Sequence, residues 1–157
     1  TDTKTTSYFC ADPEHDFSAA LHVVEMHIQS SIQSHHDKTG VQLTAIYNRS
    51  DRGEFLCTAF IDGLSVLSHK YKINIFWEMG AANHNKDICD AEGHTDKAAM
   101  DRGVAAGKLL YNQDKPHVET AAEYCNKYFS GKKRKREFVP VLDKIFHPCL
   151  PKRELHN

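Results

Sequence analysis

Hydrophobic positions along the chain alternate between short continuous runs and longer stretches with helical spacing. The continuous runs, which predict strands, cover residues 7–10, 41–47 and 73–77. Helical spacing predicts four helices, over residues 17 to about 34, 54 to about 71, 98–110 and 118–129. This alternation is typical of a mixed α/β fold, with a largely parallel sheet flanked by helices.

Some positions leave more than one interpretation open. Gly63 weakens the second predicted helix slightly, whereas Gly103 and Gly107 either permit close packing of the Ala-rich third helix or end it early. Glu25 falls on the side of the first helix opposite its apolar positions. The apolar residues 138–146 are predicted to form a short strand or helix.

Composition narrows the class of protein. The 157 residues suit one domain, and a net charge of −1 means that any basic surface has to be local. Five cysteines without a Cys-x-x-Cys pair argue against a disulfide framework and indicate a reducing compartment. No apolar run approaches the ~20 residues that a membrane helix needs, so we expect no membrane partner.

A polar stretch, residues 83–97, lies between the third predicted strand and the Ala-rich helix and is predicted to be a loop. Asp90 and Glu92 lie in it, and Asp51 directly follows the preceding predicted strand. Because successive parallel strands tend to be neighbours, these carboxylates can meet at one sheet edge. Such oxygen ligands suit Mg²⁺ or Mn²⁺, and two ions would support phosphodiester cleavage. The alternatives are a solvated loop and, for Asp51, a cap of the helix that begins at Glu54.

Residues 50–97 also carry a motif pattern: Ser50-Asp51, Glu54-Phe55, and then His84, Lys86, Cys89, Asp90, Gly93 and Lys97. It resembles the pattern of RNase H-like DDE-type transposases, in particular eukaryotic transposon-derived proteins, in the C-terminal part of the catalytic core. There the corresponding motifs are Ser-Asp-Gly, Gln-Tyr/Phe-Lys and His-Gly-Lys-Gly-x-Cys-Asp-x-x-Gly-Gly-x-x-Lys. The resemblance covers roughly residues 7–129.

The resemblance implies an RNase H-like sheet with three acidic residues around metal ions for DNA cleavage and joining. Asp51 matches the second acidic position, and Asp90 the third, with Glu92 as the alternative. The strand that carries the first acidic residue has no counterpart, so the expected fold is an N-terminally truncated RNase H-like domain over residues 1–130. Family glycines are replaced by bulkier residues, among them Asn85 and His94. Weak metal binding and poor catalysis are therefore expected.

Basic residues at two places are candidate contacts to DNA phosphates. Lys86 and Lys97 belong to the acidic stretch, and Gly131 is followed by five consecutive cations: Lys132, Lys133, Arg134, Lys135 and Arg136. This run is a candidate nuclear-localisation patch or phosphate contact, with a charged linker as the alternative. Residues 131–157 are expected to form a basic segment and C-terminal tail. His84 is a candidate ligand or phosphate contact, whereas Cys89 is interpreted as a small buried residue rather than a nucleophile.

The sequence therefore predicts a nuclear, transposase-derived protein related to DNA, degenerate as an enzyme. If active, it would use Asp51 and Asp90 with Mg²⁺ or Mn²⁺ to cleave DNA and transfer strands. The alternative is a non-catalytic interaction or nucleic-acid-binding module of relic fold. A second copy or an upstream domain is the expected partner that completes the sheet.

Overall fold

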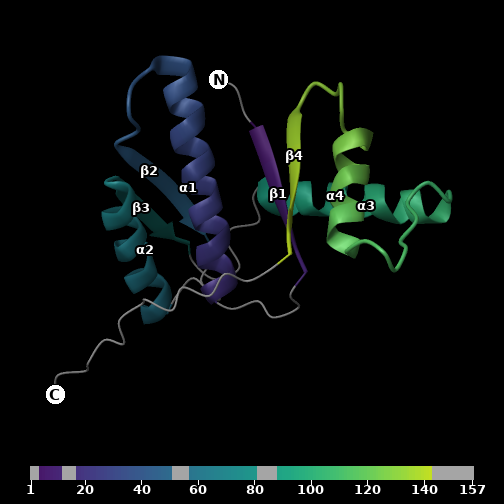
Figure 1. Cartoon of the computed structure of the whole chain (residues 1–157), viewed down its shortest axis with the longest axis horizontal. Coiled ribbons are helices and arrows are strands. Elements are labelled where there is room, and N and C mark those ends of the chain that lie inside the picture. The colour runs from purple at the N-terminus through teal and green to yellow at the C-terminus, as the bar shows by residue number, and fades with distance from the viewer. Residues whose placement is uncertain (1–3, 12–16, 51–56, 81–87, 143–157) are drawn as a thin grey trace. The chain divides into compact units, whose positions relative to one another are not determined.

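The computed structural model describes residues 4–11, 17–50, 57–80 and 88–142, over which helices and strands alternate along the chain (Figure 1). Two pairs of strands are parallel, β1 with β4 and β2 with β3, so the described chain is mixed α/β with two small parallel sheets. The elements are β1 (Lys4–Cys10), α1 (Phe17–Thr39), β2 (Ala45–Ser50), α2 (Thr58–Tyr71), β3 (Asn74–Met79), α3 (Ile88–Ala105), α4 (His117–Tyr128) and β4 (Lys135–Val141).

These elements belong to two compact units. One contains α1, β2, α2 and β3 and is called the α1–α2 unit; the other, the α3–α4 unit, contains β1, α3, α4 and β4. The basic segment expected to follow the domain from residue 131 instead runs into β4. This strand pairs with β1 over seven residues and buries Phe138, which makes it part of the α3–α4 unit.

The core of the α1–α2 unit forms where the two helices pack on one face of β2 and β3. Leu21 and Ile28 of α1 and Phe60 and Leu67 of α2 are all buried in it. Gly63 lies where α1 packs against α2, since a Cβ atom there would come within 2.4 Å of Leu21 Cδ1. The helix propensity lost at Gly63 is therefore offset by closer packing.

Helix α2 begins later than predicted but ends at the predicted residue. It begins four residues after Glu54, and its N-cap is Cys57, whose Sγ accepts a hydrogen bond from the Phe60 N–H at 3.4 Å. The cap of α2 is therefore Cys57 rather than Asp51. At the other end, Lys72 adopts a left-handed backbone conformation with φ of 53°, which stops the helix where the prediction stopped it.

Glu25 is buried, although it lies off the apolar side of α1. Its Oε1 accepts hydrogen bonds from Lys70 Nζ and from the Tyr71 hydroxyl, both at 2.6 Å, and Gln29 donates to the same hydroxyl at 2.8 Å. Burial and the bond to Glu25 raise the pKa of Tyr71, and the bond to Glu25 raises the pKa of Lys70. These contacts join α1 to the end of α2.

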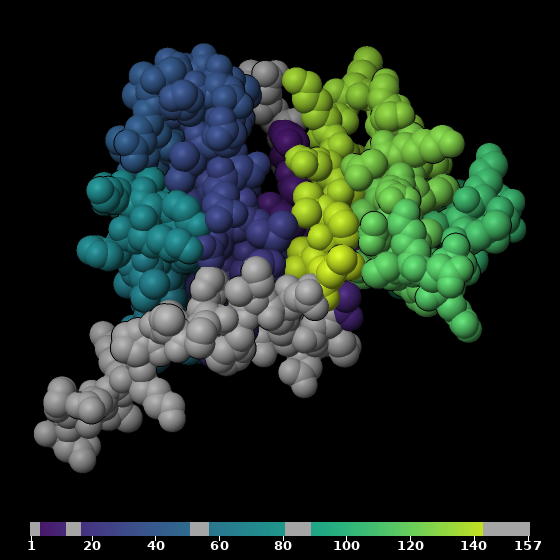
Figure 2. Space-filling view, viewed as in Figure 1, coloured from purple at the N-terminus to yellow at the C-terminus, as the bar shows by residue number. Residues whose placement is uncertain are grey.

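In the α3–α4 unit the core lies between the helices and β4. Its buried members are small side chains from the helices and two aromatic rings, Phe129 and Phe138, whose centroids are 5.4 Å apart. Figure 2 shows β4 (yellow) and α4 (green) side by side at the surface of this unit. The other buried members are Ala99, Ala122 and Cys125.

Asn126 of α4 completes the hydrogen bonding of β4. Its amide nitrogen donates to the Phe138 carbonyl, and its amide oxygen accepts from the Phe138 N–H, each at 2.9 Å. Because β1 pairs with the opposite edge of β4, the Asn126 amide takes the place of a neighbouring strand at this residue.

Helix α3 begins at Ile88, ten residues before the predicted start, so the stretch with Asp90 and Glu92 is helical rather than a loop. Of the two interpretations of its glycines, close packing applies to Gly103 and an early end of the helix applies to Gly107. A Cβ atom at Gly103 would come within 2.5 Å of the Tyr124 ring, whereas Gly107, with φ of +69°, turns the chain just beyond the helix. No described helix combines the length and apolar character that crossing a membrane requires.

Candidate functional site

The acidic residues of α3 divide between two sides of the helix. Glu92 and Asp96 are four residues apart, so they lie on the same side, and both are buried. Asp90 lies in the first turn and is exposed, where its charge favours the helix N-terminus. The two candidates for a third metal-binding carboxylate, Asp90 and Glu92, thus have different surroundings.

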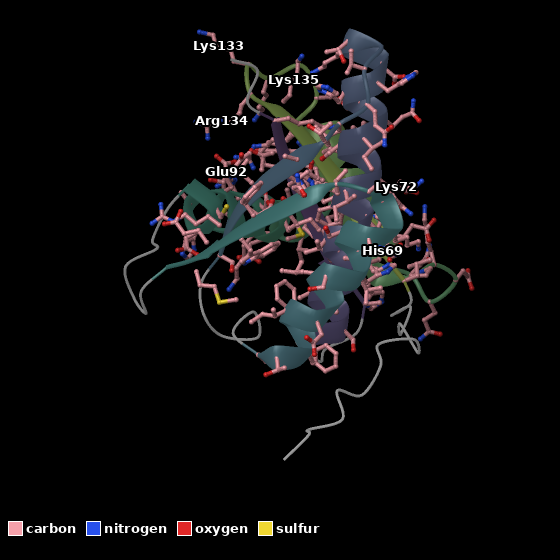
Figure 3. The ribbon with its side chains drawn as sticks, turned by 90° about the vertical axis from the view of Figure 1, so that its left-hand side faces the viewer. His69, Lys72, Glu92, Lys133, Arg134 and Lys135 are labelled. Atoms are coloured by element: carbon pink, nitrogen blue, oxygen red, sulfur yellow. The ribbon has the colours of Figure 1, made fainter. Side chains whose placement is uncertain are left out.

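The basic run also divides, with Arg134 in the bend before β4 and Arg136 in the strand itself. Arg134 and Arg136 contact carboxylates of α3, whereas Lys133 and Lys135 are exposed and take no part in these contacts. Figure 3 shows Arg134 directed toward Glu92, with Lys133 and Lys135 pointing away. The run of five like charges therefore supplies one buried cation, Arg136, and one exposed cation, Arg134, to the carboxylates of α3, and leaves the lysines free of this cluster.

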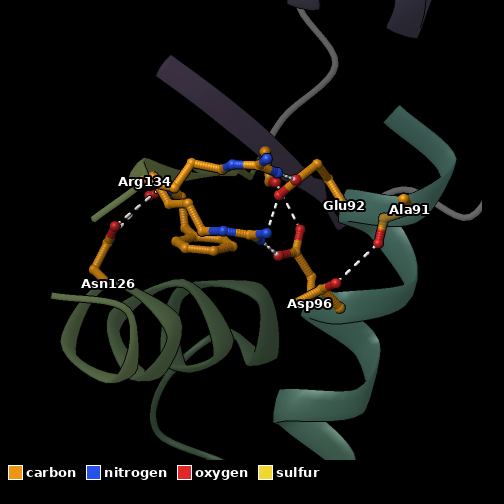
Figure 4. A network of polar contacts seen from close by, with 9 residues as sticks. Ala91, Glu92, Asp96, Asn126 and Arg134 are labelled. Atoms are coloured by element: carbon orange, nitrogen blue, oxygen red, sulfur yellow. Dashed lines mark hydrogen bonds and ion pairs between the residues drawn. The ribbon is translucent and has the colours of Figure 1, made fainter. Parts of the chain in front are cut away.

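The two arginines and two carboxylates form a cluster to which Ser7 of β1 also binds; Figure 4 shows Arg134, Glu92 and Asp96 in it. Arg136 Nη1 donates to Asp96 Oδ1 at 2.6 Å, and Ser7 Oγ donates to Asp96 Oδ2 at 2.7 Å. Arg136 Nη2 is ion-paired with Glu92 Oε2, a contact without hydrogen-bond alignment, and Arg134 Nη1 binds Glu92 Oε1. Each carboxylate thus faces a guanidinium.

Burial shapes the electrostatics of this cluster. The side chains of Arg136, Glu92 and Asp96 are each 7% exposed. The Arg136 guanidinium carbon lies 4.6 Å from the Phe129 ring centroid, a distance at which a cation is attracted to the ring face. Loss of hydration lowers the pKa of Arg136 and raises the pKa of Asp96, and the hydrogen bond from Ser7 opposes the second shift.

The cluster changes what Glu92 can do chemically. A carboxylate that binds a divalent ion has to turn its oxygens to the metal. Both oxygens of Glu92 face arginines, so a metal would have to displace Arg134 and Arg136 from them. Asp90 has no such competitor in this cluster and keeps the exposure that a ligand requires.

Several predicted site residues lie outside the described part of the chain: Asp51, His84 and Lys86. A shared Asp51–Asp90 metal site therefore stays a prediction. Lys97 is exposed on α3, and Cys89 is exposed in its first turn, so the interpretation of Cys89 as a buried residue was wrong. Within residues 4–11, 17–50, 57–80 and 88–142, no group of three or more His, Cys, Asp and Glu side chains is arranged to hold a metal.

The α1–α2 unit contains a hollow of about 910 Å³ between α2 and β3. The described walls are apolar for just over half of their residues, with aliphatic Ile73 and aromatic Trp77 among them, and their charged or titratable members are His69 and Lys72. Figure 3 shows these two side chains near the C-terminal end of α2, His69 in its last turn and Lys72 just beyond it. Because the described lining has no carboxylate, it offers no ligand set for Mg²⁺ or Mn²⁺.

Comparison of the chain with known protein families, with curated proteins and with solved structures finds no match. The residues in the described structure therefore carry the functional argument.

Sequence reasoning missed the role of Asp96 and the internal role of Arg136. The signal was present, because Glu92 and Asp96 have helical spacing whereas Arg134 and Arg136 have strand spacing. It was obscured by reading residues 83–97 as a loop and the basic run as one uniform segment. Ser7 had no signal of its own, since its contact with Asp96 spans 89 positions in the sequence.

Proposed function

We propose that this chain is a transposase-derived nuclear protein that binds DNA, and that its α3 carboxylates serve structure rather than metal-dependent catalysis. The observation that carries the proposal is the pairing of buried Glu92 with Arg134 and Arg136. This pairing offsets the negative charge that an active metal site would need. The transposase origin is supported by the motif resemblance and by the position of Asp90, in the helix that follows β3.

Support for DNA as the partner comes from the cations that the cluster leaves outside. Lys132, Lys133 and Lys135 are exposed around the start of β4, and Lys97 is exposed on α3. The described residues of the α3–α4 unit hold more Lys and Arg than Asp and Glu, although the whole chain carries a net charge of −1. A locally positive surface of this kind attracts the phosphate backbone.

The test is DNA affinity as a function of salt concentration. Lys133→Gln with Lys135→Gln is expected to flatten the log–log salt slope by roughly 0.9 for each lost contact to duplex phosphate. Lys38→Gln with Lys72→Gln, two exposed lysines of the α1–α2 unit, is the matched control and should leave the slope unchanged. Equal slopes for both variants, or no DNA binding by the parent, would contradict the proposal. Arg134 and Arg136 are left intact because their loss would disturb the cluster.

Catalysis is the second candidate, since Asp90 is exposed in the first turn of α3. In this alternative, Asp51 and Asp90 bind Mg²⁺ or Mn²⁺ and the chain cleaves or joins DNA. We expect no metal-dependent nicking of supercoiled plasmid by the chain. Nicking by the parent that Asp51→Ala with Asp90→Ala abolishes would establish the alternative.

A further inference from the structure

A pocket of about 580 Å³ lies between the C-terminal end of α3 and the last turns of α4. Its walls combine cations with aromatic rings, and all of them belong to the α3–α4 unit. The described lining contains no carboxylate; it consists of Arg102, Ala106, Lys108, Tyr124, Lys127 and Tyr128. The volume falls within the range of about 300–1,000 Å³ typical of small-ligand pockets.

The backbone around the pocket explains how its walls come together. Gly103 lets the Tyr124 ring lie against α3, and the Tyr124 hydroxyl reaches the Ala99 carbonyl at 3.4 Å. Beyond the helix, Gly107 turns the chain, and the Lys108 N–H binds the Gly103 carbonyl at 2.9 Å. Lys108 is thereby held beside the helix that it follows.

The cations act together on Tyr128. A hydrogen bond from Arg102, followed by the charges of Lys132, Arg102 and Lys108, lowers the pKa of Tyr128. Lys132 Nζ lies 4.3 Å from the centroid of the Tyr128 ring, which also stacks with Tyr124 at 5.8 Å. The field in the pocket therefore favours a negative charge next to two aromatic rings.

We infer that this pocket binds one nucleotide of a single strand of DNA, with its phosphate among Arg102, Lys108 and Lys127 and its base against Tyr128. Single-stranded nucleic acid is recognised by this combination of a positive groove and aromatic faces. When the nucleotide binds, the exposed Lys132 side chain moves off the face of the Tyr128 ring and pairs with the phosphate, and the base stacks on the ring face that it vacates. A duplex keeps its bases stacked inside, so it cannot use the rings in this way. The inference rests on the proposed DNA binding and adds the form of DNA that the unit prefers.

The experiment compares fluorescence anisotropy of a labelled oligothymidylate of about 12 nucleotides with that of a duplex of equal length. We expect Tyr128→Leu to weaken single-strand binding about tenfold and leave duplex binding unchanged, since one stacked base supplies that much. Arg102→Gln with Lys108→Gln should weaken single-strand binding by at least as much. Lys38→Gln with Lys72→Gln again serves as the control, and far-UV circular dichroism verifies folding of each variant.

Two further measurements separate this inference from the proposed function. Thymidine monophosphate should compete with the labelled strand better than inorganic phosphate; equal competition would overturn the role of the rings. Binding that is lost in Lys133→Gln with Lys135→Gln but unchanged in all the pocket variants would overturn the pocket and leave DNA binding intact. A chain that binds neither form of DNA would overturn both, whereas the expected pattern supports both.

Discussion

Replacing Arg136 by methionine is expected to remove much of the stability of the α3–α4 unit. The Arg136 side chain faces both Glu92 and Asp96, and all three are 7% exposed. Without the guanidinium, Asp96 keeps no ion pair with any described residue, and Glu92 keeps only the one with Arg134. Breaking a buried ion pair from one side costs about 3–5 kcal/mol, and serving two carboxylates puts Arg136 toward the upper end of this range.

Arg134→Met is the matched control because it removes the same charge from a position two residues away. The Arg134 side chain is 57% exposed, and exposed ion pairs contribute only about 0–1 kcal/mol. The difference between the two variants therefore measures burial rather than charge. A third variant, which replaces Arg136, Glu92 and Asp96 together by apolar residues, should recover most of the lost stability, since it leaves no buried charge behind.

The assay has to report on the right unit. The chain has one tryptophan, Trp77, and it belongs to the α1–α2 unit, so its fluorescence would miss the expected change. Urea unfolding followed by far-UV circular dichroism, together with hydrogen exchange of the Phe138 amide, covers the α3–α4 unit. A loss below about 1 kcal/mol for Arg136→Met, or one equal to that of Arg134→Met, would refute the reasoning.

Three other predictions follow from single residues. Burial raises the folded pKa of Asp96 above its ordinary value of 3.8, so the stability of the parent relative to Asp96→Asn should fall as the pH rises from 3.8 through the folded pKa, measured by urea unfolding. Burial also raises the pKa of the Cys125 thiol to about 11, so a thiol reagent at pH 8 should modify exposed Cys89 and leave Cys125 intact until the unit unfolds, as mass mapping would show. Gly103→Ala should displace the Tyr124 ring and weaken single-strand binding, although alanine favours the helix by about 0.5–1 kcal/mol; unchanged affinity would contradict the packing argument.

Hydrophobic spacing was sufficient to predict most helices and strands because the buried face of each is visible as a repeat of apolar residues within its own segment. The four helices follow from apolar positions such as Leu21 and Phe60, and the alternation of helices and strands predicted parallel pairing, although one sheet was expected and the described residues form two separate strand pairs. The early start of α3 could not be predicted in this way. Its first three turns bury Glu92 and Asp96, and these carboxylates depend on arginines about 40 residues away.

The same reason limited prediction of the candidate site. A sequence shows that Lys133 and Arg134 carry the same charge, but not that only one of them faces buried acid. Whether a charge is available to DNA depends on the alternation of β4 and on α3 beside it. The pocket near Tyr128 was also missed, because only Lys127 adjoins the tyrosines in the sequence, whereas Arg102 and Lys108 come from the end of α3 and the turn after it.

The Asn126 amide has a consequence for the way this sheet can be extended. At Phe138 it already satisfies the backbone groups that an incoming chain would need, so an extended segment cannot add there without expelling the side chain. Within the described residues, β1 has β4 as its only neighbouring strand. Growth of the sheet is therefore directed to the β1 side, and Asn126 protects the β4 side against unspecific strand addition and aggregation.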